Sequence, residues 1–104
     1  MSALRRSPRA GWTLVSLRDG AWRVELVGDR DAVQSAHTDL VRPMLGGPLH
    51  HPGHCALIYD ALGALREAFP RFPRLADGTR IEVPSTPPAD GTAPTPRVVA
   101  PRAP

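Results

Sequence analysis

The sequence predicts a small single α+β domain with the element order ββααββ, in which two helices pack on a small antiparallel sheet and a proline-rich C-terminal tail follows. Three observations carry this prediction. Alternating apolar residues flank an Asp19-Gly20 pair, two later stretches place apolar residues at helical spacing, and the end of the chain is rich in proline. We therefore divide the 104-residue chain into a flexible basic N-terminus (1–10), a folded body (11–83) and an extended proline-rich tail (84–104).

The first predicted element is a β-hairpin between Gly11 and Gly28. Asp19-Gly20 is a strong hairpin signal because both central residues of a type I′ turn need a positive φ. Before this turn, the alternating pattern places Trp12, Leu14 and Ser16 on one face of a strand. After it, a second strand alternates between two sets of residues: Trp22, Val24 and Leu26 on one face, and Arg23, Glu25 and Val27 on the other. The two tryptophans are expected to supply much of the buried area of the sheet.

A first helix is predicted from about Arg30 to Arg42. Asp29 or Asp31 provides an N-cap carboxylate, and Pro43 is expected to end the helix because it lacks the N–H that a helical hydrogen bond needs. The apolar stripe is made of Val33, Ala36, His37, Leu40 and Met44. His37 is therefore expected to be a core or interface residue with one hydrogen-bonded nitrogen.

A second helix is predicted to start after His54 and to run to about Phe69, where Pro70 stops it. Its stripe at helical spacing consists of Leu57, Ile58, Ala61, Leu62, Leu65, Ala68 and Phe69. A shorter hairpin with an Asp77-Gly78 turn is predicted over residues 72–83. The tail has only Val98-Val99 as consecutive strong hydrophobes, so we expect it to be disordered or polyproline-like unless a partner holds it.

Composition bounds the class of protein. All thirteen Lys-plus-Arg positions are Arg, a bias typical of a high-GC bacterium, and the net charge of +3 comes from scattered residues rather than from one basic block. No stretch is apolar enough for a signal peptide or a membrane span, so we expect a cytoplasmic protein that does not contact a membrane. A single cysteine excludes an internal disulfide.

The stretch from Leu49 to Cys55 raises the question of a metal site, because it holds three of the four histidines and the only cysteine. Imidazole and thiolate suit zinc or copper, and the weak candidates are His50, His51, His54 and Cys55. Structural zinc sites usually draw ligand pairs from separate segments, whereas these residues are nearly contiguous and Pro52 stiffens them. We therefore expect a loop without a metal, and no cofactor.

Cys55 is also a weak catalytic candidate. At the start of a helix, the free N–H groups and a neighbouring histidine would favour the thiolate that acts as a nucleophile. The alternative is a half-buried small hydrophobe that closes the core. The chain offers few carboxylates to orient a catalytic base, so we expect a protein that is not an enzyme.

Nucleic-acid binding is a further alternative, because two helices followed by a hairpin resemble the layout of a helix-turn-helix with a wing. Arg71, Arg74 and Arg80 around the second hairpin would contact phosphates. Against it, the exposed side of the second helix would be nearly neutral and the linker is longer than usual.

The leading hypothesis is a non-enzymatic accessory subunit, adaptor or regulator that binds another protein or a second copy of itself. It would dock through its helical layer and its tail, since polyproline segments are already extended and lose little entropy on binding. The candidate partner-binding residues are Tyr59, Arg66, Pro87, Pro88 and Pro101. The alternatives are a small DNA-binding regulator, or a metal or thiol site protein that uses His51 and Cys55.

Overall fold

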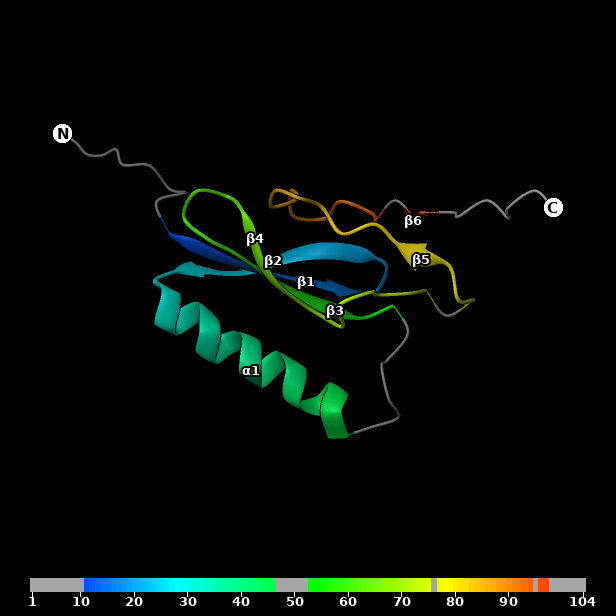
Figure 1. Ribbon diagram of the computed structural model, residues 1–104, viewed down its shortest axis with the longest axis horizontal. Coiled ribbons are helices and arrows are strands. Elements are labelled where there is room, and N and C mark those ends of the chain that lie inside the picture. The colour runs from blue at the N-terminus through cyan, green and yellow to red at the C-terminus, as the bar shows by residue number, and fades with distance from the viewer. Residues whose placement is uncertain (1–10, 47–52, 76, 95, 98–104) are drawn as a thin grey trace.

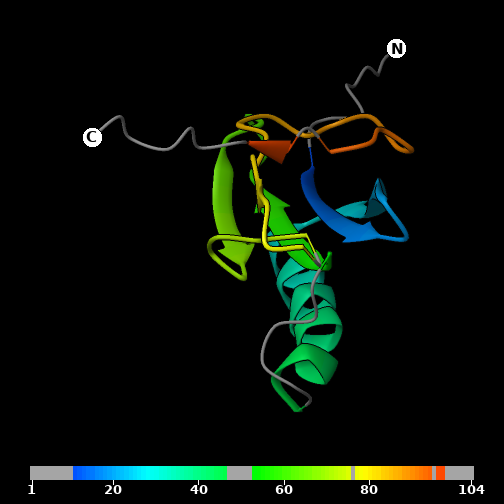
Figure 2. The ribbon, with the colours of Figure 1, turned by 90° about the vertical axis from the view of Figure 1, so that its right-hand side faces the viewer.

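The computed structural model describes residues 11–46, 53–75, 77–94 and 96–97 of the chain. A four-stranded antiparallel sheet with the order β2-β1-β3-β4 lies at its centre, and one helix, α1, packs on one face of it (Figure 1). We call this the helix face. The segment that follows β4 returns over the opposite face, as Figure 2 shows from the side. The coarse prediction of a small α+β domain is therefore confirmed.

The first hairpin is present as predicted. β1 (Trp12–Arg18) and β2 (Ala21–Gly28) pair from Trp12 opposite Gly28 to Arg18 opposite Ala21, and both Asp19 (φ 53°) and Gly20 (φ 78°) have positive φ. The strict alternation that we expected is interrupted, however. A β-bulge between Leu14 and Val15 pairs these residues with Leu26 and Val24, so Glu25 is an extra residue in β2.

The first helix is also present, but it continues further than predicted. α1 spans Arg30–Gly46, and the preceding residue, Asp29, caps it, because its carboxylate accepts a hydrogen bond of 2.8 Å from the Ala32 N–H. The prediction that Pro43 ends the helix is wrong. Pro43 lies in the last turn, where its missing N–H costs one hydrogen bond and only three residues follow it.

The predicted second helix does not exist. Its residues form β3 (Cys55–Tyr59) and β4 (Leu65–Phe69), joined by a tight turn, so the order ββααββ is wrong. All five residues of β3 are at most 1 % exposed. A strand in a sheet that is covered on both faces buries every side chain, whereas a helix on a sheet buries only one stripe. The continuous apolar run of β3 is therefore buried more completely in a strand than in a helix.

Two clusters of buried side chains hold the layers together. On the helix face Leu14 and Ile58 contact Val33 of α1, with Trp12, Leu26 and Leu40 around them. The opposite face carries the larger cluster, which consists of Val15, Leu17, Trp22, Cys55, Leu57, Tyr59 and Ile81. Thus the two tryptophans lie on opposite faces of the sheet.

The second predicted hairpin is a short turn around Gly78, whose φ is +91°. The backbones of Arg74 and Arg80 form an isolated antiparallel β-bridge, and the Ile81 N–H donates to the Pro73 carbonyl at 3.0 Å. β5 (Arg80–Ile81) then pairs with β6 (Pro96–Arg97) in a separate two-stranded sheet. This turn places Ile81 against the larger cluster.

Residues 84–94, which we call the strap, differ from the expectation of an unattached tail. The Tyr59 hydroxyl donates to the Pro84 carbonyl at 2.7 Å. Further along, the Trp22 N–H donates to the Thr92 carbonyl, the Gly91 N–H donates to the Trp22 carbonyl, each at 2.8 Å, and the Asp90 carboxylate accepts from the Val24 N–H. The strap therefore occupies the outer edge of β2 and lies over the face opposite α1, which we call the strap face.

Gly20 provides a test of the turn. We expect Gly20→Ala to destabilise the fold by about 1 kcal/mol, because a side chain resists the positive φ although nothing lies within 4 Å of the added Cβ. Gly28→Ala is the matched control, since its φ is ordinary and its Cβ would meet only the Ala32 Cβ at 3.9 Å. Equal melting temperatures for the two variants in thermal unfolding would contradict the turn.

Asp90 provides a test of the strap. We expect Asp90→Ala to speed hydrogen exchange at the amides of Trp22, Val24 and Gly91, because the carboxylate that fixes the strap to β2 is lost. Asp90→Asn should retain protection, since its amide oxygen still accepts the Val24 N–H. If these three amides exchange as fast in the native chain as in the Ala variant, the strap is not held as described.

Candidate functional site

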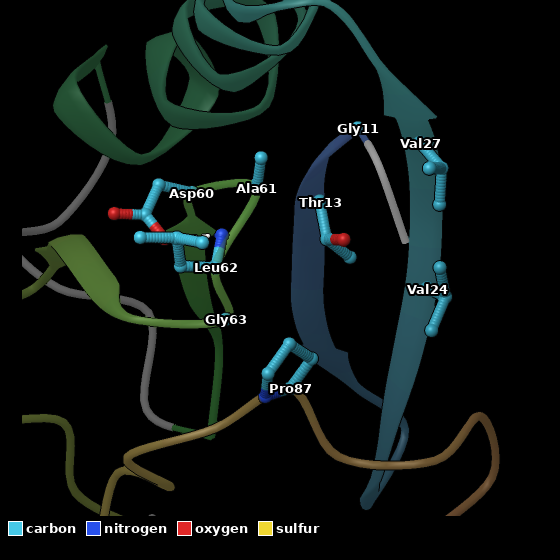
Figure 3. A pocket seen from close by; sticks show the side chains of 9 residues that line it. All are labelled: Gly11, Thr13, Val24, Val27, Asp60, Ala61, Leu62, Gly63 and Pro87. Carbon is cyan, nitrogen blue, oxygen red and sulfur yellow. Dashed lines mark hydrogen bonds between the residues drawn. The ribbon is translucent and has the colours of Figure 1, made fainter. Parts of the chain in front are cut away.

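An open groove of about 500 Å³ lies on the part of the strap face that the strap leaves uncovered. In Figure 3 the side chains of Val24 and Val27 stand on one side of the groove, the turn between β3 and β4 forms the other side, and Thr13 lies between them. Pro87 of the strap closes one end. The full lining is Gly11, Thr13, Val24, Val27, Asp60, Ala61, Leu62, Gly63 and Pro87.

The β-bulge explains why two valines line the same groove. Residues three positions apart in a regular strand point to opposite faces of the sheet. Because Glu25 is the extra residue, Val24 pairs with Val15 and Val27 pairs with Thr13, and both valines line the groove on the strap face. Val24 is 37 % exposed and Val27 is 48 % exposed. Exposing two neighbouring apolar side chains to water is unfavourable, and polar residues at these positions would avoid that cost.

The turn on the other side of the groove is rigidly built around Asp60. Its carboxylate accepts hydrogen bonds from the Leu62 N–H at 2.9 Å and the Ala64 N–H at 3.0 Å, and its N–H donates to the Ala64 carbonyl. Gly63 supplies the positive φ of +86° that closes the turn. As a result Leu62 is fixed at the tip with 93 % of its surface exposed.

The charges of the groove are balanced within its own wall. Among the described residues that line it, Asp60 is the one ionisable side chain, and Arg66 of β4 lies 3.8 Å from the Asp60 carboxylate. The carboxylate is thus engaged by two N–H groups and a guanidinium. The groove therefore offers apolar contact rather than a free acid or base.

The residues of the predicted metal site are not brought together as a ligand set. His50 and His51 lie outside the described residues, and the described residues contain no group of three His, Cys, Asp or Glu side chains that could hold a metal ion. His54 is half-buried and engaged in an interaction of its own. Cys55 is completely buried in β3.

The premise of the nucleophile hypothesis for Cys55 is wrong. Cys55 begins a strand and not a helix, so no helix N-terminus stabilises its thiolate. Burial raises the pKa of the Cys55 thiol from its ordinary value of 9.0 to about 12. The thiol therefore packs as a small hydrophobe in the larger cluster, as the alternative interpretation held.

The predicted partner-binding residues lie in different environments. Tyr59 is fully buried, and burial, with a smaller contribution from Cys55, raises the pKa of its hydroxyl above the usual range. Arg66 is exposed beside the groove and faces Asp60. Pro87 lines the groove, Pro88 lines a second hollow beneath the strap beside Trp22, and Pro101 lies outside the described residues.

His37 is buried between α1 and the sheet, as its place on the apolar stripe predicted. Its Nδ1 lies 4.0 Å from the Glu67 carboxylate of β4, while its buried Nε2 has no hydrogen-bond partner among the described residues. The Glu67 carboxylate also accepts a long hydrogen bond from Gln34 at 3.4 Å. The 4.0 Å separation of Nδ1 from Glu67 is longer than a hydrogen bond.

The arginines proposed for phosphate contact are partly engaged within their own loop. The Arg74 guanidinium donates to the Gly78 carbonyl at 3.0 Å, and the Arg80 guanidinium lies 5.0 Å from the centre of the Phe72 ring. The helix-turn-helix layout that suggested DNA binding depends on the second helix, which the structure replaces with two strands.

Sequence reasoning missed Val24, Val27 and Leu62 as site residues. Leu62 was assigned to the buried stripe of a helix, although Asp60 and Gly63 flank it with the spacing of a tight turn. The position of the bulge in β2 carries no comparable signal in the sequence. No family model matches this chain, and no curated protein or solved structure is significantly similar to it.

Cys55 gives a prediction on pH dependence. Between pH 9 and pH 12 the thiol of the unfolded chain loses its proton while the thiol of the folded chain keeps it. The contribution of Cys55 to the free energy of unfolding is therefore fully present below pH 9 and is lost as the pH rises. The slope approaches about 1.4 kcal/mol per pH unit for one such group. Cys55→Ala should be less stable at neutral pH through lost packing but should show a shallower alkaline decline in urea unfolding.

Alkylation of Cys55 by iodoacetamide is the second measurement. The native thiol should react only as fast as the chain opens, and urea should accelerate the reaction strongly. Rapid labelling of the folded chain near neutral pH would show that Cys55 is neither buried nor protonated as described.

Proposed function

We propose that this chain is a non-enzymatic protein-binding module of the cytoplasm, an accessory subunit, adaptor or regulator, and that its docking site is the groove on the strap face. One observation carries the proposal. Three exposed apolar residues, Val24, Val27 and Leu62, line one groove, and Asp60, the ionisable residue among its described lining, is paired with Arg66. Contiguous exposed apolar surface of this kind marks interaction sites more often than ordinary solvated surface.

The shape of the groove favours a macromolecular partner over a small molecule. Small-molecule sites are usually enclosed and carry a few precisely placed polar groups. Here one wall is a projecting turn, and the polar atoms of Asp60 are used to hold that turn. A partner that contributes an apolar side chain gains burial without having to satisfy an unpaired charge.

The proposal keeps the class of function that the sequence suggested and moves the docking surface. The helical layer was expected to dock, but the second helix is absent and α1 uses its apolar stripe against the sheet. The tail contributes through Pro87, which closes the groove, rather than as a free arm. The DNA-binding alternative loses its structural premise, and the thiol alternative conflicts with the burial of Cys55.

Leu62→Asp tests the proposal. In affinity purification of the full chain from its host, we expect a stoichiometric partner with the native sequence and a loss of at least about tenfold in its recovery with Leu62→Asp, because a carboxylate would be desolvated in the interface. Ser35→Asp on the exposed side of α1 is the matched control, since it adds the same charge away from the groove.

Both variants should fold, because both positions are exposed, and circular dichroism checks this. Recovery of the same partner in equal amounts with Leu62→Asp and with Ser35→Asp would exclude the groove as the docking site. Absence of any partner that depends on Leu62 would argue against the proposed function itself.

A further inference from the structure

We infer that Phe72, Arg74 and Arg80 form a binding site for single-stranded nucleic acid, in which the two arginines hold phosphates and a base stacks on the phenylalanine. We call these three residues the arginine patch. The site goes beyond the protein-binding groove, with which it shares no lining residue, and it needs no recognition helix. Figure 1 shows β5 at the end of the molecule opposite the turn between β3 and β4, so the two surfaces lie apart.

The backbone places Arg74 and Arg80 directly opposite each other in an isolated antiparallel β-bridge. Hydrogen bonds flank this bridge on both sides, from the Ile81 N–H to the Pro73 carbonyl at 3.0 Å and from the Leu75 N–H to the Thr79 carbonyl at 2.8 Å. A pair flanked in this way has no hydrogen bond of its own, and its Cα atoms are about 4.5 Å apart, the closest approach in an antiparallel ladder. The two arginine side chains therefore leave the backbone side by side.

The arginine patch lies on the outer side of this turn. Pro73 and Ile81 are buried, and neighbouring residues in extended backbone point to opposite sides, so Arg74 and Arg80 face away from the core. The Arg80 guanidinium lies 5.0 Å from the centre of the Phe72 ring, which is 60 % exposed. Aromatic rings and guanidinium planes are the flat surfaces on which proteins stack unpaired bases.

The positive charges of the arginine patch are not neutralised by the described residues. Neither Arg74 nor Arg80 forms an ion pair with a described carboxylate, and Arg74 donates one hydrogen bond of 3.0 Å to the Gly78 carbonyl. The nearby carboxylate of Asp77 accepts a hydrogen bond within the turn, and Glu82 has an interaction of its own. Like charges directly opposite each other destabilise a sheet, so a bound anion would offset a cost that the free chain carries.

The register of β6 continues the row of arginines at the level of the backbone. Arg97 is the partner of Arg80, so three arginines occupy matching positions on three neighbouring backbone segments. Arginine suits phosphate because its planar guanidinium donates two parallel hydrogen bonds to two oxygens. The formal net charge of +3 also attracts an anionic partner to the chain as a whole.

The exposed ring favours a single strand over other polyanions. Bases of a single strand are free to stack on an aromatic side chain, whereas bases of a duplex are already stacked on each other. An acidic peptide would pair with the arginines but would leave the Phe72 ring without a stacking partner. Single-stranded nucleic acid is therefore the occupant that uses all three residues.

Fluorescence anisotropy with a labelled oligothymidylate of about 12 nucleotides tests the inference with the full chain. We expect Arg80→Ala to weaken binding about tenfold and to reduce the slope of log K against log salt concentration by about 0.7, because one phosphate contact is lost. Phe72→Leu should also weaken binding about tenfold but should leave the slope unchanged, because it removes stacking and no charge.

Two control variants change the charge elsewhere. Arg42→Ala removes one positive charge from an exposed position on α1, on the opposite face of the sheet, and should bind the oligothymidylate like the native chain. Leu62→Asp should also bind it like the native chain, so failure of the groove and failure of the arginine patch are distinguishable. Circular dichroism checks that each variant is folded.

Heparin and a DNA duplex of the same length separate single-strand binding from general attraction to polyanions. Phe72→Leu should leave heparin binding unchanged, because heparin has no bases to stack. If Phe72→Leu weakens heparin and oligothymidylate equally, the ring does not act by stacking and the inference is wrong. Tighter binding of the duplex, no binding of the oligothymidylate at low salt, or an affinity that Arg80→Ala leaves unchanged would also overturn it.

Discussion

The burial of β3 on both faces is the constraint on which the rest of the structure depends. The five residues from Cys55 to Tyr59 alternate between the helix face and the strap face, and every one of them is excluded from water. A strand of this kind needs two covering layers. α1 is the first layer, and the second is formed by the described residues that follow Pro73, which is why Ile81 belongs to the core of this small domain while the strap is tied to it by the Tyr59 hydrogen bond.

The parts of the fold that the sequence predicts correctly are those with local causes. The Asp19-Gly20 turn follows from backbone conformation, and the start of α1 follows from the Asp29 cap. The prediction of a second helix is wrong because the interactions that decide the structure of this segment are not local. Between Leu57 and Phe69 the apolar residues fit helical spacing, but the run that ends at Tyr59 is buried on both faces only because two distant segments cover it.

The candidate site is harder to predict than the fold, because it depends on features with weak sequence signals. Val24 and Val27 line one groove only through a bulge that inserts Glu25, and alternation alone assigns them to opposite faces. The tail was expected to leave the body because proline-rich segments bury little. Here it is held mainly by main-chain groups, with the Trp22 N–H and carbonyl both paired to the strap, and composition does not reveal such pairing.

The position of the groove follows from where the second layer stops. Along β1 the side chains of Leu17 and Val15 on the strap face are fully buried, whereas Thr13, next in the same row, is only half-buried at the floor of the groove. Among the described residues, the hydrogen bonds between the strap and β2 lie at Trp22 and Val24. One end of the face is therefore completed by the chain itself, and the other end presents apolar walls that a partner side chain would complete. Hydrogen bonds to β2 and to Tyr59 hold the strap over one end of this face, whereas Val24 and Val27 stay exposed at the other end, and this contrast supports the docking surface that we propose.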